Sequence, residues 1–102
     1  MGFNPTRFVY VIQVQQIEEE ILEPYLLPEA FTSRTEARKR MAEVAESFLK
    51  NNPEYEALDG IDINFDDIEL HHKDPSNCYA MYLEVLELEL YDTVKESKGE
   101  TE

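Results

Sequence analysis

The sequence predicts an α+β fold: a single small domain with a mainly antiparallel sheet in ββαββ order and one amphipathic helix packed on one face. Three segments alternate apolar and polar residues with the period of a strand, and a fourth returns across a short acidic turn. One segment between the strand pairs carries an apolar stripe of helical period. A chain of 102 residues supports one modest core. We expect one domain over residues 1–92 and a flexible acidic C-terminal tail over 93–102.

The first strand is expected from Arg7 onward. One parity holds Phe8, Tyr10, Ile12 and Val14. Both parities are apolar in the first half of this segment, which suits a central place in the sheet. Residues 21–27 follow an acidic turn and are expected to form the returning strand of a hairpin. Because proline cannot donate to a ladder, Pro24 and Pro28 indicate that this strand lies at an edge or is bulged.

The helix is expected to begin at Ser33-Arg34-Thr35-Glu36, which has the pattern of a capping box. The apolar stripe that follows is formed by Ala37, Met41, Val44 and Phe48. Asn51-Asn52-Pro53 is a stop signal. The outer face offers pairs four residues apart, Glu36 with Arg40, Lys39 with Glu43, and Glu46 with Lys50. Such ion pairs each contribute about 0.3 kcal/mol and would account for the basic residues of this segment.

The last two strands follow an acidic link over residues 53–60. Ile61, Ile63 and Phe65 alternate with polar residues, and Ile68 and Leu70 continue one position out of phase. The slip predicts a bulge near Asp66-Asp67 or a strand break. Residues 74–77 have turn chemistry. Residues 79–91 alternate with one change of phase, which predicts a bent strand, although their leucines and glutamates leave a helix as the alternative.

No pattern of residues indicates catalysis, a cofactor or a metal. Residues 62–67 open like a calcium loop, but Asp67 stands where glycine is needed and Lys73 where glutamate is needed. His71, His72 and Cys78 are too few for a zinc site, and adjacent histidines on a strand point to opposite faces. Cys78 is interpreted as a small half-buried hydrophobe, because nothing near it suggests an activating base. We expect a protein that is not an enzyme and holds no cofactor.

The charge of the chain is its most informative functional feature. It has 23 acidic and 9 basic residues, a net charge of −14. Residues 33–50 carry five basic and three acidic residues, so the rest of the chain carries −16. This excess disfavours direct binding to nucleic acid or to an anionic membrane and favours basic protein partners. Without a signal-peptide pattern or an apolar run of about 20 residues, the expected location is cytoplasmic.

The sequence therefore predicts a non-catalytic protein that binds a basic protein partner through acidic strand faces and the first hairpin turn. The predicted partner-binding residues are Glu18, Glu19, Glu20, Glu23, Asp62, Asp66, Asp67, Glu69, Glu84, Glu87 and Glu89. The charge excess is comparable with that of duplex DNA, one charge per about 1.7 Å, over the width of such a domain. The specific hypothesis is an inhibitor that mimics nucleic acid. It would occupy the basic groove of a nucleic-acid-binding protein and exclude the nucleic acid. The alternative is a self-associating structural or scaffold protein whose charge serves only solubility.

Overall fold

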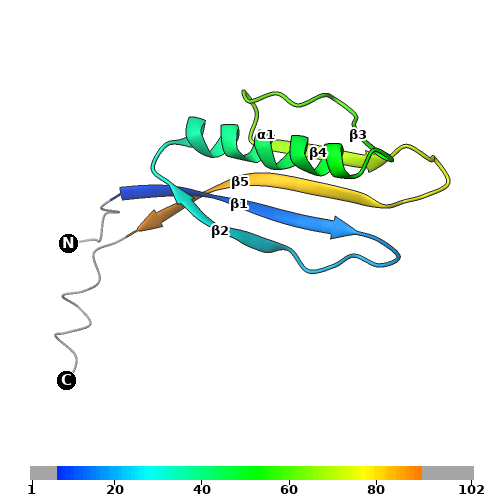
Figure 1. Cartoon of the computed structure of the whole chain (residues 1–102). Coiled ribbons are helices and arrows are strands. Elements are labelled where there is room, and N and C mark those ends of the chain that lie inside the picture. Colours follow the sequence, from blue (N-terminus) through cyan, green and yellow to red (C-terminus); the bar gives the residue numbers. More distant parts are fainter. Residues whose placement is uncertain (1–6, 91–102) are drawn as a thin grey trace, which may run out of the picture.

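A computed structural model describes residues 7–90, which form a five-stranded antiparallel sheet with one helix across one face (Figure 1). The elements are β1 (Arg7–Ile17), β2 (Tyr25–Phe31), α1 (Arg34–Asn51), β3 (Tyr55–Ala57), β4 (Asp67–His72) and β5 (Ala80–Leu90). The strand order is β2-β1-β5-β4-β3. The α+β prediction is confirmed. The predicted domain boundary at residue 92 and the predicted tail lie outside the described residues.

The predicted ββαββ order is wrong because an additional strand follows the helix. β3 lies within the expected link and pairs with β4 from Tyr55↔His72 to Ala57↔Leu70. Residues 61–65, which were expected to begin a strand, lie in none. Their backbone forms hydrogen bonds within the loop, such as the one of 3.3 Å that Phe65 N–H donates to Asp62 O. β4 begins at Asp67 with no strand directly before it, so neither the predicted bulge nor the predicted strand break is present at Asp66-Asp67.

The central place of β1 and the edge position of β2 are both confirmed. β1 pairs with β2 on one side and with β5 along its whole length on the other. In the β1–β2 pair, Val11 is opposite Ala30 and Gln13 is opposite Leu26, so residues 27–29 stand opposite one residue of β1. Pro28 thus lies where the ladder of an edge strand is interrupted, which is where proline is tolerated.

The core lies between α1 and the sheet. The helix contributes Ala37, Met41, Ala42 and Ala45, all buried. The strands contribute Ile12 and Val14 from β1, Ile68 and Leu70 from β4, and Met81, Leu83 and Val85 from β5. Three alanines on the buried stripe have small side chains that let α1 approach the sheet closely, and Met41 fills the space between them. Burial of each large apolar side chain stabilises the fold by about 1.5–3 kcal/mol.

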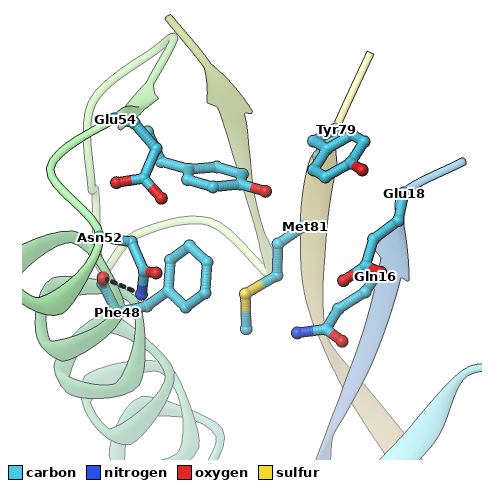
Figure 2. A pocket seen from close by; sticks show the side chains of 9 residues that line it. Gln16, Glu18, Phe48, Asn52, Glu54, Tyr79 and Met81 are labelled. Atoms are coloured by element: carbon cyan, nitrogen blue, oxygen red, sulfur yellow. Dashed lines mark hydrogen bonds between the residues drawn. The ribbon is translucent and has the colours of Figure 1, made fainter. Parts of the chain in front are cut away.

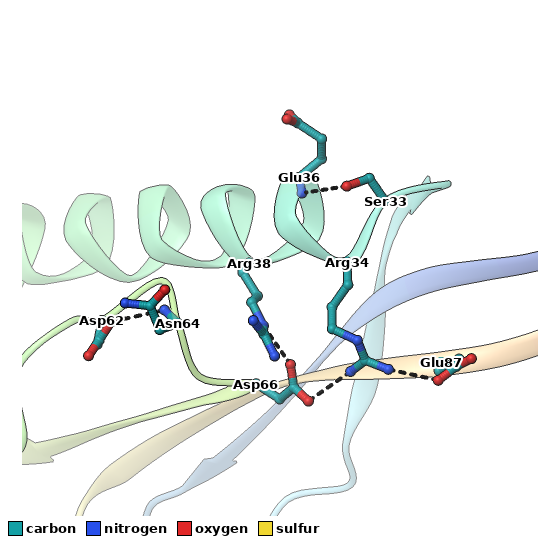
Figure 3. A network of polar contacts seen from close by, with 8 residues as sticks. All are labelled: Ser33, Arg34, Glu36, Arg38, Asp62, Asn64, Asp66 and Glu87. Carbon is teal, nitrogen blue, oxygen red and sulfur yellow. Dashed lines mark hydrogen bonds and ion pairs between the residues drawn. The ribbon is translucent and has the colours of Figure 1, made fainter.

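The side-chain contacts predicted for α1 form only in part. The Ser33 side chain accepts a hydrogen bond of 3.3 Å from Glu36 N–H, but the Glu36 carboxylate points away from Ser33 (Figure 3) and lies 3.8 Å from Lys39. Half of the capping box is therefore formed. None of the three predicted pairs of the outer face is among the ion pairs of residues 7–90. Arg40 instead contacts Glu43 at 3.3 Å and Glu29 of β2 at 3.0 Å.

Residues 79–91 were predicted to be a bent strand, with a helix as the alternative, and β5 confirms a strand over Ala80–Leu90. Its register with β1 runs without a shift, so the change of apolar phase reflects a change of face. Met81, Leu83 and Val85 lie under α1, whereas Leu86 and Leu88 lie on the opposite surface of the sheet. We call this surface the open face. By alternation and register it carries Val9, Val11, Gln13, Gln15, Ala30, Leu26, Glu56, Asp67, Glu69, His71, Tyr82, Glu84, Leu86 and Leu88.

Candidate functional site

The predicted partner-binding carboxylates lie in different parts of the fold, and one group is neutralised by arginines of α1 (Figure 3). Arg34 donates to Asp66 Oδ2 and to Glu87 Oε1, both at 2.7 Å. Arg38 Nε donates to Asp66 Oδ1, also at 2.7 Å. Arg34 also stands over the ring of Tyr10, 5.0 Å from its centroid. These contacts join the first turns of α1 to the loop before β4 and to β5.

The same contacts change the acid strength of Asp66. The hydrogen bond from Arg38 and the one from Arg34 lower the pKa of the Asp66 carboxyl, and the nearby guanidinium charges act in the same direction. The pKa of Arg34 is raised, chiefly by its hydrogen bond with Asp66. Asp66 and Glu87 therefore serve as internal ion-pair partners, and they add little to an external acidic surface.

Three other predicted residues also lie apart from the open face. The Asp62 carboxylate accepts a hydrogen bond of 2.9 Å from Asn64 N–H and stabilises the loop that follows β3. Glu89 stands in register with Phe8, on the α1 side of the sheet. Glu23 is exposed in the segment that precedes β2. The structure does not bring these carboxylates together.

A compact acidic group does form on the open face. Asp67 of β4 stands directly opposite Glu84 of β5, and Glu69 follows Asp67 on the same strand. Glu56 of β3, which sequence reasoning missed, lies opposite His71 on this face. His71 Nε2 is 3.5 Å from Glu69 Oε1, an ion pair only when the imidazole is protonated. This nitrogen is enclosed and has no hydrogen-bond partner among the described residues.

Lysine and arginine residues lie away from this acidic group. Between Phe8 and Leu90, arginine and lysine occur only on α1 and at Lys73, which follows β4. None of them lies on the open face. Like charges directly opposite one another on adjacent strands are destabilising, so the pair of Asp67 and Glu84 leaves a local excess of negative charge that no ion pair of residues 7–90 offsets.

The remaining predicted residues, Glu18, Glu19 and Glu20, lie exposed on the β1–β2 turn beside a hollow of about 220 Å³ (Figure 2). We call it the aromatic hollow. Its lining is Gln16, Glu18, Phe48, Asn52, Glu54, Tyr55, Tyr79, Ala80 and Met81. Sequence reasoning missed all of these except Glu18, because they come from four separate segments with no shared spacing. The only sign of this hollow within a single segment is an acidic residue next to an aromatic one, Glu54 beside Tyr55.

The described residues hold no group of three or more histidine, cysteine or acidic side chains that could bind a metal ion. His71 lies on the open face and His72 on the α1 side, as strand alternation predicts. The interpretation of Cys78 as half-buried is wrong. It is exposed, since its turn lies at the end of the sheet, and its Sγ is 3.9 Å from the Glu18 carbonyl oxygen.

The comparisons with known proteins add no functional assignment. The chain matches no protein-family model, no curated protein and no solved structure. Among residues 7–90, no helix is long and apolar enough to cross a membrane.

Proposed function

We propose that this chain is a cytoplasmic, non-catalytic protein that binds a basic protein partner through the open face of its sheet. The observation that carries the proposal is the acidic group formed by Asp67, Glu69 and Glu84 on a face without lysine or arginine between Phe8 and Leu90. Asp67 and Glu84 stand opposite each other, where the Cα atoms of paired strands are about 4.5–5.5 Å apart. A cationic side chain placed between them would relieve their repulsion.

The residues around the acidic group favour a protein, rather than a simple cation, as the binding partner. Apolar side chains continue the same surface, among them Leu26 of β2, which is 50% exposed, and Leu88 of β5, which is 39% exposed. Protein interfaces combine an apolar centre with a polar rim in this way. The negative field of the open face would steer a basic partner toward it and increase the association rate.

The specific version of the proposal is that the partner binds nucleic acid and that the open face mimics it. Asp67 and Glu69 lie two residues apart on β4, a spacing of about 6.6 Å. Glu84 adds a charge on the neighbouring strand. Asp66 and Glu87 do not contribute to this array, since arginines bind them. Fewer carboxylates would therefore mimic nucleic acid than the composition of the chain suggests.

An affinity capture with two matched variants tests the proposal. The open-face variant combines Asp67→Asn, Glu69→Gln and Glu84→Gln, and the helix variant combines Glu36→Gln, Glu43→Gln and Glu46→Gln on the exposed side of α1. Both remove the same number of charges. We expect a basic protein from the source lysate to be retained by the wild-type chain and by the helix variant and lost with the open-face variant. Displacement of this protein by duplex DNA would support mimicry; equal retention by both variants would contradict the proposal.

Self-association is a second candidate, favoured by the exposed apolar side chains around the edge strand β2. Tyr25 is 48% exposed and Leu26 is 50% exposed on that strand. Because apolar contacts and strand pairing are screened little by salt, such an oligomer should persist at high ionic strength. Sedimentation velocity over a range of protein and salt concentrations measures this directly. A monomer at every concentration would exclude the candidate.

A further inference from the structure

The aromatic hollow lies on the α1 side of the sheet, between the C-terminal end of α1 and the first residues of β5. Figure 2 shows Phe48 and Tyr79 on its two sides and Met81 between them. The Phe48 and Tyr55 rings meet edge to face with their centroids 5.0 Å apart. Tyr55 continues through His72, at 5.4 Å, to Tyr79, at 6.4 Å from His72. Aromatic faces attract weakly hydrated organic cations.

Two carboxylates give the hollow a negative potential. Glu54 lies on the side of α1 and Glu18 on the side of β1 (Figure 2). Burial raises the pKa of the Tyr55 phenol, and the charges of Glu18 and Glu54 raise it further. Lys50 and Lys73 are the basic residues that flank Glu54 in the sequence, and neither forms an ion pair with Glu18 or Glu54 within residues 7–90. The hollow is therefore arranged to oppose an anion and to favour a cation.

The size of the hollow restricts the kind of cation. Its volume of about 220 Å³ is below the roughly 300–1,000 Å³ of pockets for drug-sized ligands, so it suits a head group. Calcium needs about 6–8 oxygen ligands, whereas this lining has only two carboxylates beside its three aromatic rings. An ammonium group on an alkyl chain fits both the volume and the lining.

A second hollow extends the site. It has a volume of about 570 Å³ and is lined by Glu18, Glu19, Glu20, Leu22 and Tyr79. Because Glu18 and Tyr79 line both hollows, the two adjoin. A chain that leaves the aromatic hollow past Tyr79 reaches the glutamates of the β1–β2 turn. A second cationic group on the same chain would meet Glu19 and Glu20 there.

We infer that the two hollows together bind an alkylammonium chain that carries at least two cationic groups. One ammonium occupies the aromatic hollow against Phe48, Tyr55 and Tyr79, and a second lies on the glutamates of the turn. A free polyamine and a lysine-rich peptide share this chemistry. The site lies on the α1 side of the sheet, so it is independent of the function proposed for the open face.

Titration of the ¹⁵N-labelled full chain, followed by NMR, tests the inference. The probes are spermidine, a dilysine peptide, choline and magnesium chloride, at an ionic strength of about 0.15 M, where the Debye length is about 8 Å. We expect spermidine or the dilysine peptide to shift the amide signals of residues 16–20, 48–55 and 79–81. The stronger of the two identifies the source of the ammonium group. Choline, with one cationic group, should bind the same amides more weakly.

Three variants connect the binding to the named side chains. Tyr79→Leu should weaken binding about tenfold, because it removes an aromatic face shared by both hollows. Glu18→Gln keeps the shape of an exposed side chain and should weaken binding about threefold. Glu46→Gln removes the same charge from the outer face of α1 and should leave the affinity unchanged. The amide spectrum of each variant verifies its fold, and Glu18→Gln remains decisive if Tyr79→Leu does not fold.

Two results would overturn the inference. One is an absence of shifts at these residues with both spermidine and the dilysine peptide. The other is general attraction of counter-ions, in which magnesium produces the same shifts with the same affinity, or Glu46→Gln weakens binding as much as Glu18→Gln.

Discussion

At the scale of single residues, two arginines decide which carboxylates can act outside the molecule. Arg34 and Arg38 are four positions apart on α1 and therefore project from the same side of the helix. Both reach Asp66, and Arg34 also reaches Glu87. A count of acidic residues in the sequence therefore overstates the number of carboxylates that are available to a partner. Such long-range ion pairs cannot be predicted from the spacing of residues. They tie the start of α1 to segments 28 to 53 residues away.

The first residue-scale prediction concerns Asp66→Asn. Its carboxyl has a lowered pKa in the folded protein, so its contribution to stability is present above its unfolded pKa of about 3.9 and is lost as the pH falls through the folded value. With the side chain 40% exposed, we expect a loss of about 1 kcal/mol at neutral pH. The loss should shrink as the pH falls below about 4. Urea denaturation of both proteins across this range measures it, with Asp59→Asn at an exposed position as the control. A constant difference at all pH values would contradict the assignment.

A second prediction concerns the acidic pair of the open face. Glu84→Gln should raise the free energy of unfolding by about 0.2–1 kcal/mol, because it removes repulsion with the directly opposed Asp67. Asp67→Asn should have a similar effect. The two changes together should gain less than the sum of the single gains, since either one already removes the repulsion. Urea denaturation of the four proteins gives this double-mutant cycle, and full additivity would show that the two carboxylates do not interact.

At the scale of elements, the sequence predicts best where local chemistry and periodicity agree. The start and end of α1, β1 and β5 follow from alternation, an N-cap and a stop signal, all of which act over a few residues. β3 has only three residues, too few for a period to be seen. Residues 61–65 alternate as a strand does but lie outside the sheet, since the ladder opposite β5 begins after Asp66. Their pairing partner is fixed by tertiary structure, which alternation cannot reveal.

The N-terminal cap of α1 gives the element-scale prediction. Ser33→Ala should lower the free energy of unfolding by about 1 kcal/mol, because Glu36 N–H loses the side-chain acceptor at 3.3 Å. Ser47→Ala, within the exposed side of the same helix, is the matched control and should be neutral or slightly stabilising, since alanine has the higher helix propensity. Thermal and urea denaturation give both values. Equal effects of the two substitutions would mean that the cap contributes nothing.

At the scale of the whole molecule, the fold separates charges that the sequence mixes. The three arginines of α1 form ion pairs with carboxylates of β2, of β5 and of the loop before β4, while the open face keeps Glu56, Asp67, Glu69 and Glu84. Composition predicts an acidic surface but cannot place it, because one residue of register decides which face each carboxylate occupies. The aromatic hollow could not be predicted from the sequence either. Its members meet only when the ends of β1 and α1, β3 and the start of β5 are packed together.

This separation of charge predicts how salt affects stability. Exposed like charges repel across distances that salt screens, with a Debye length of about 30 Å at 0.01 M and about 10 Å at 0.1 M. The wild-type chain, with a net charge of −14, should therefore unfold at a higher temperature as salt is added. The open-face variant should respond less than the helix variant of equal net charge, because it removes clustered repulsion whereas the helix variant removes partners of Lys39 and Arg40. Thermal unfolding of the three proteins at the two salt concentrations measures these slopes. If both variants have the same slope, net charge alone governs the response, and the open face has no special electrostatic role.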